Sequence, residues 1–158
     1  MFADMIDPEL LDLYSARMKV LAASMTDAVV VNAAHAVVQR RSPLCGSQVT
    51  FSVVLDSAGQ LSALGYDVQA CALAAAASAI VVSAAPGLSL SDLSTVRDQV
   101  RAMLKGQDVV FPGGRWADLD ILRPAEVVPS RHGSVMLPFD TLVDAFSQAL
   151  DAHSSDNP

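Results

Sequence analysis

The chain has 158 residues, of which 52% are hydrophobic and 17% are charged, and its mean hydropathy is +0.39. This composition is too apolar for a disordered protein. The length predicts one domain over residues 1–158, with a frayed tail after about residue 152. The formal net charge of −7 offers no basic surface for phosphate groups, so nucleic acid is not an expected partner.

Neither the N-terminus nor the most apolar segment predicts a membrane anchor. The first eight residues contain two aspartates in place of the basic start of a secretion signal. The run Ala70–Ala85 is shorter than the roughly 20 apolar residues that span a bilayer, and Pro86-Gly87 ends it. We therefore expect a buried helix there, no membrane partner, and a cytoplasmic protein. Its two cysteines are too few for a disulfide framework and should be reduced.

The spacing of apolar residues predicts a helix followed by strands in the first half of the chain. The helix covers Pro8–Met25, where apolar residues recur at intervals of three, four and seven. Val-rich residues 29–31 and 36–40 predict a strand or two. Residues 48–56 alternate between apolar and polar side chains, and with residues 60–68 they predict an antiparallel hairpin.

The second half of the chain is predicted to be helical. After the Ala-rich helix, we expect helices over Leu88–Leu104, capped by Ser89 or Ser91, over Trp116–Leu122, and over Pro138–Ala152. The whole order predicts an α+β fold, in which helices pack on one face of a small antiparallel sheet.

Two thiols are the main candidates for chemistry. Cys45 lies in a loop between Pro43 and Gly46, which restrict and then free the backbone. Cys71 lies where the second hairpin strand gives way to a helix, whose unpaired N–H groups favour a thiolate. Thiolates bind soft metals or attack persulfides. The alternative for both residues is that they fill the core, as free cysteines often do.

Three segments resemble motifs of the IscU/SufU/NifU-type iron–sulfur cluster assembly scaffolds. Residues 41–50, RSPLCGSQVT, are similar to the first motif, N-P-x-C-G-D followed by a strand. Residues 65–79, GYDVQACALAAAASA, resemble the second, G-x-G-C-A-I-S-x-A-S-x-S. Residues 130–139, SRHGSVMLPF, resemble the third, R-x-x-C-A-x-L-P-W, at the spacing of the SufU-like branch. The resemblance implies that family's α+β fold with a three-stranded antiparallel sheet.

The resemblance also implies a ligand set, which this sequence retains only in part. In the family, three cysteines and an Asp two residues after the first cysteine hold a nascent cluster or a zinc ion. Cys45 and Cys71 carry over, whereas Ser47 stands at the Asp position and Ser134 at the third cysteine position. A serine hydroxyl is a poor ligand for iron or zinc. His132 is a candidate further metal ligand, with an exposed loop histidine as the alternative.

Other residues near the third motif fit the family less closely. The IscU branch has a histidine immediately before its third cysteine, and that position is Gly133 here. Arg131 matches the arginine of the SufU-like motif and would be a cation near the thiolates, or an ordinary surface residue. His35 and His153 lie away from all three motifs, and we expect them to be structural or exposed.

The resemblance implies a non-enzymatic scaffold that binds iron or a labile [2Fe-2S] cluster through Cys45 and Cys71, with zinc as another candidate metal. A cysteine desulfurase and other iron–sulfur assembly proteins are the expected partners. A homodimer could hold a [2Fe-2S] unit with two thiolates from each chain. Two alternatives stay open. Cys71 or Cys45 could accept persulfide sulfur from a desulfurase, as in SufU-like members, or the chain could be a metal-free interaction module.

Overall fold

The computed structural model describes residues 8–43 and 46–156. Its three strands form one antiparallel sheet in the order β1 (Ala36–Arg41), β2 (Gln48–Leu55) and β3 (Leu61–Gln69). The helices are α1 (Pro8–Ala23), α2 (Ala72–Ala84), α3 (Leu90–Leu104), η2 (Gly114–Val127), η3 (Pro129–Arg131) and α4 (His132–Asp156). This confirms the α+β fold and the three-stranded sheet.

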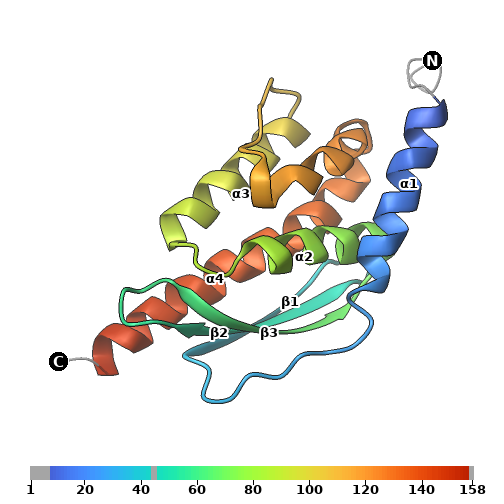
Figure 1. Cartoon of the computed structure of the whole chain (residues 1–158). Helices are drawn as coiled ribbons and strands as arrows, with labels where there is room; N and C mark the ends of the chain where they lie inside the picture. The colour runs from blue at the N-terminus through green and yellow to red at the C-terminus, as the bar shows by residue number, and fades with distance from the viewer. Residues whose placement is uncertain (1–7, 44–45, 157–158) are drawn as a thin grey trace.

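The helices cover one face of the sheet. Figure 1 shows α2 and α4 crossing the same side of the sheet, with α1 standing beside α2. Alternate residues of β2 point into this layer, and Val49, Phe51 and Val53 are fully buried there. Most of the facing residues of α2 are alanines, which let the helix lie close to its neighbours. The alternation in β2 and the apolar run of α2 therefore predicted the core correctly.

The strand register brings distant loops together. Arg41 at the end of β1 pairs with Gln48 at the start of β2, and Gln48 in turn pairs with Gln69 at the end of β3. The β1–β2 connection and the β3–α2 connection therefore leave the sheet at the same end.

The Val-rich runs 29–31 and 36–40 predicted a strand or two, and only the second run forms a strand, β1. Val29 makes a single bridge to Tyr66, in which each main-chain N–H lies 2.8 Å from the other residue's carbonyl oxygen. Ala33, at φ 55°, lies in the turn that follows. The bridge depends on Gly65, because a Cβ there would lie 2.9 Å from the Val29 carbonyl oxygen.

The helix predicted over residues 116–122 is a longer 3₁₀-helix, η2. Its buried side chains include Trp116, Leu119, Leu122 and Ala125. This spacing of three is the period of a 3₁₀-helix, which places every third residue on one face. Asp118 on the exposed side binds Arg17 of α1 at 2.8 Å, and this hydrogen bond raises the pKa of the Arg17 guanidinium.

The last helix is longer than predicted at both ends. α4 runs from His132 to Asp156, whereas the sequence predicted Pro138–Ala152. Proline lacks an N–H and therefore favours a helix start, but here Pro138 lies inside the helix, where burial of Val135 and Leu137 supports the turn before it. At the other end, the His153 ring packs edge-on against His35, with ring centroids 5.3 Å apart. Packing at both ends therefore extends the helix beyond its sequence signals.

Ion pairs connect α4 to β1 and to α3. Arg40 of β1 lies 3.1 Å from Asp144, and Arg101 of α3 lies 2.8 Å from Asp140. Among the described residues, no helix is long and apolar enough to cross a membrane.

The capping of α3 gives a direct stability prediction. Ser89 Oγ accepts the Asp92 N–H at 3.1 Å, and the Asp92 carboxylate accepts the Ser89 N–H at 3.2 Å. Ser89→Ala removes one half of this capping box and should lower the free energy of unfolding by about 0.5–2 kcal/mol, measured by urea denaturation. Ser91→Ala is the matched control and should have little effect. Equal losses in both variants would contradict the assignment of the cap to Ser89.

Candidate functional site

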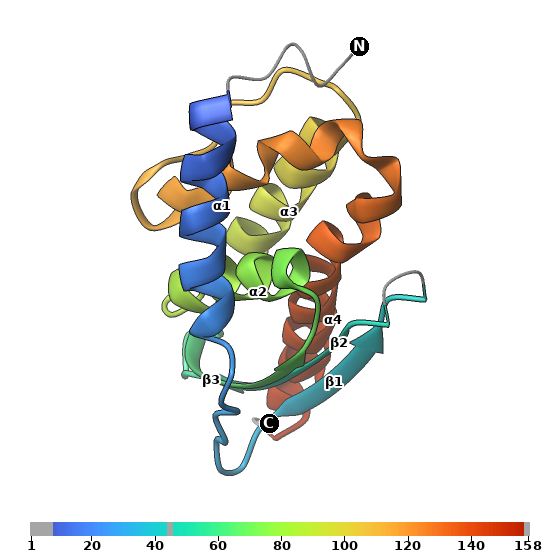
Figure 2. The same ribbon diagram turned by 90° about the vertical axis from the view of Figure 1, so that its right-hand side faces the viewer.

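The three motifs meet at one end of the sheet. The connection between β1 and β2 carries the first motif, the N-terminus of α2 the second, and the first turn of α4 the third. Figure 2 shows the starts of β2 and α4 at this end, and α4 packs against both β1 and β2. Ser42, Ser47, Cys71 and Gly133 are thus neighbours in the fold, although about 90 positions of sequence separate the first from the last.

Cys45 lies outside the described residues, so its role as a ligand stays a prediction. The base of its loop is described. The Ser42 N–H donates to the Ser47 carbonyl oxygen at 2.8 Å, and the Gly46 N–H donates to the Ser42 carbonyl oxygen at 3.0 Å. Gly46 has φ 68°, in the left-handed region that glycine adopts without strain. The loop that carries Cys45 is therefore closed at its base.

Cys71 is the N-cap residue of α2. Its backbone is extended, with φ −61° and ψ 163°, and its carbonyl oxygen accepts the Ala75 N–H at 2.8 Å. The side chain is partly exposed and makes no capping hydrogen bond. The first-turn N–H groups of α2 have no acceptor within the helix. The thiol thus lies at the positive end of a helix and within reach of solvent, which suits a metal ligand or a nucleophile.

Ser47 links the first motif to the second. Its Oγ accepts the main-chain N–H of Cys71 at 3.0 Å, and the residue is only 1% exposed. The sequence identified Ser47 only as a substituted ligand and missed this contact. The signal that could have found this contact was the register of the β2–β3 hairpin, which places residue 47 beside the end of β3.

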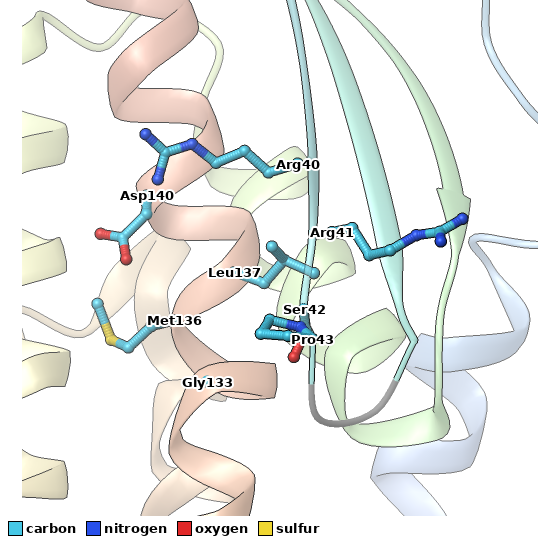
Figure 3. A pocket seen from close by; sticks show the side chains of 8 residues that line it. All are labelled: Arg40, Arg41, Ser42, Pro43, Gly133, Met136, Leu137 and Asp140. Atoms are coloured by element: carbon cyan, nitrogen blue, oxygen red, sulfur yellow. The ribbon is translucent and has the colours of Figure 1, made fainter.

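The third motif lies against the first. Ser134 is 1% exposed in the first turn of α4, and a Cβ built on exposed Gly133 would lie 3.8 Å from Ser42 Oγ. Figure 3 shows the pocket beside this contact, of about 240 Å³, with Gly133 and Met136 on one wall and Ser42 and Pro43 on the other. Gly133, which stands where the IscU branch has a histidine, therefore lines a pocket that is open to solvent.

His132 is held by the main chain of η2. Its Nε2 lies 2.9 Å from the carbonyl oxygens of both Ala125 and Glu126. Because carbonyl oxygens only accept, Nε2 carries the proton, and Nδ1 is the nitrogen that could bind a metal. His132 is partly buried at the start of α4, so it is not the exposed loop histidine that was the alternative.

Of the remaining candidates, one is exposed and two are partly buried. Arg131 is exposed at the end of η3. His35 and His153 contact each other, and His35 Nδ1 accepts the Leu55 N–H at 3.1 Å, which fits the structural role expected for the pair. In the part of the chain that the structure describes, no group of three or more His, Cys, Asp or Glu side chains is arranged to hold a metal ion.

The comparisons with known proteins agree with this arrangement. The family model described as the NifU-like N-terminal domain matches residues 18–111, more than half of the chain. A crystal structure of the N-terminal part of a nitrogen-fixing NifU-like protein from Brucella abortus superimposes with a TM-score of 0.80 at 30% sequence identity. The match covers 90% of this chain and 97% of that one.

Two further solved structures are more distant in sequence and show the fold alone. One is a hypothetical protein, with a TM-score of 0.75 and 20% identity over 86% of this chain and 98% of that one. The other is a protein of Fervidobacterium islandicum AW-1 assigned to the iron–sulfur cluster assembly scaffolds of the SUF system. Its TM-score is 0.73 and its identity 18%, over 89% of this chain and 99% of that one. No curated protein matches the sequence. The chain therefore belongs to the NifU-like N-terminal domain family.

Proposed function

We propose that this protein acts as a scaffold in iron–sulfur cluster assembly and binds iron or a labile [2Fe-2S] cluster through Cys71 and Cys45. The observation that carries the proposal is the placement of Cys71. Its partly exposed thiol lies at the N-terminus of α2 and next to the base of the Cys45 loop, which the hydrogen bond from the Cys71 N–H to Ser47 Oγ holds in place. Iron and sulfide are the cargo of this site, and two thiolates can hold them only with further ligands.

The proposal also covers the ligands that would bind alongside Cys71 and Cys45. His132 Nδ1, a small thiol, water or the thiolates of a second chain would complete the set, and zinc is an alternative occupant. Ser47 supports this view because its hydroxyl already accepts the Cys71 N–H and a neutral hydroxyl is a weak ligand. A cysteine desulfurase is the proposed source of sulfur. We further propose that the protein is cytoplasmic and has no enzymatic activity of its own.

Anaerobic reconstitution with iron and sulfide tests the metal proposal. The wild-type protein should gain visible absorbance, and Cys71→Ser should abolish it because the thiolate is lost. The double variant Cys71→Ser/Ser83→Cys is the matched control, since it restores the number of thiols at the exposed far end of α2 and should stay colourless. Circular dichroism confirms that each variant folds. A wild-type protein that stays colourless would contradict the proposal.

Ser134→Cys should strengthen the site. The resemblance places Ser134 where the family has its third cysteine, and a thiolate is a far better ligand for iron than a hydroxyl. The variant should therefore lose iron to a chelator more slowly than the wild-type protein, as followed by the decay of visible absorbance. Ser130→Cys adds a thiol at an exposed position of η3 and should leave the rate unchanged. Equal rates for all three proteins would argue against Ser134 as a ligand position.

Sulfur transfer is the second candidate function, and the partial exposure of the Cys71 thiol favours it. In this reaction, the Cys71 thiolate attacks the terminal sulfur of the desulfurase persulfide. The sulfur–sulfur bond of the desulfurase breaks, its cysteine leaves as a thiolate, and Cys71 becomes the persulfide.

Mass spectrometry of the Cys71 peptide tests the transfer after incubation with a cysteine desulfurase and free cysteine. One added sulfur atom on this peptide, removable by dithiothreitol and absent in Cys71→Ser, is the expected result. An unmodified peptide while the desulfurase turns over would exclude Cys71 as the acceptor.

A further inference from the structure

We infer that Ser47 is a positioning residue for Cys71 and that its hydroxyl fixes the backbone of this cysteine instead of binding metal. This inference rests on the proposed function of the Cys71 site and adds the residue that orients it. The contact that carries it is the 3.0 Å hydrogen bond from the Cys71 N–H to Ser47 Oγ.

Ser47 joins three parts of the site. Its carbonyl oxygen accepts the Ser42 N–H at 2.8 Å and closes the base of the Cys45 loop. The next residue, Gln48, starts β2 and pairs with Gln69 at the end of β3. Its side chain then reaches the N-cap residue of α2. A shift of Ser47 would therefore move the base of the Cys45 loop, at Ser42 and Gly46, relative to Cys71.

The hydrogen bond takes over a task that the Cys71 side chain does not perform. A Ser, Thr, Asp or Asn side chain at an N-cap accepts an N–H of the first turn and so fixes the cap residue. The Cys71 thiol makes no such bond, and the main-chain N–H of an N-cap residue lies outside the helical hydrogen-bond pattern. The Ser47 hydroxyl thus orients the cysteine through its backbone and leaves the thiol available.

The burial of Ser47 makes this hydrogen bond hard to replace. The residue is 1% exposed, so water has little access to Oγ, and loss of an acceptor at a buried position is costly. A carboxylate, which the family has at this position, also accepts an N–H. Serine therefore keeps the acceptor and gives up the negative charge that would bind a metal.

Amide hydrogen exchange of Cys71, measured by NMR on the metal-free protein, tests the hydrogen bond. Ser47→Ala should speed exchange of the Cys71 amide on the order of tenfold, and Ser47→Thr should restore protection because it keeps a hydroxyl. Ser78→Ala is the matched control. It removes a buried hydroxyl from the same helix, where Ser78 Oγ donates to the Ala74 carbonyl oxygen at 2.8 Å, and leaves the Cys71 amide alone.

Titration with Co²⁺, followed by its thiolate charge-transfer absorbance, tests the positioning. The dissociation constant should rise in Ser47→Ala and return in Ser47→Thr, with Ser78→Ala close to the wild-type protein. Unchanged amide exchange in Ser47→Ala, or faster exchange with unchanged Co²⁺ binding, would overturn the inference. Equal losses in Ser47→Ala and Ser78→Ala would also overturn it. A wild-type protein that binds no Co²⁺ would instead contradict the proposed function, so the two failures are distinguishable.

Discussion

The register of the β2–β3 hairpin is the constraint on which the site depends. Because Gln48 lies opposite Gln69, the loop that enters β2 and the loop that leaves β3 meet at one end of the sheet. A slip by one residue would turn Val49 and Phe51 away from the core, since side chains alternate between the faces of a strand. The burial of these side chains therefore fixes the register, and the register in turn places Ser47 beside Cys71.

The third segment of the site depends on the packing of α4. This helix crosses β1 and β2 and contacts α2 and α3, so its first turn cannot move independently of the core. The ion pairs of Asp140 and Asp144 connect it to α3 and β1, although pairs this exposed contribute little to stability. Burial of apolar side chains along α4 contributes more to the stability of its packing. Ser134 is thus held near the first motif by the same core that fixes the hairpin.

Much of this architecture could be predicted from the sequence, and the exceptions have physical causes. The alternation in residues 48–55 and the apolar run of α2 predicted a strand and a buried helix correctly, because burial on one side leaves a periodic pattern. The predicted start of α4 at Pro138 was six residues too late, because tertiary packing supports a proline inside this helix. The spacing of three between the buried residues of η2 is present in the sequence, but the helix predicted over residues 116–122 does not reflect it. The hydrogen bond between Ser47 and Cys71 follows from the register of the hairpin and not from either segment alone.

The motif resemblance predicted the candidate residues, and the structure describes the surroundings of Cys71, Ser47, Ser134 and His132. A hydrogen bond connects Cys71 to Ser47, Ser134 is buried in the first turn of α4, and His132 contacts the main chain of η2.

The central claim is that a site with two cysteines still binds iron. Iron and acid-labile sulfide, measured in protein purified without oxygen, test it most directly. Both elements present in comparable amounts, and absent from Cys71→Ser, is the predicted result. Wild-type protein free of both would contradict the account.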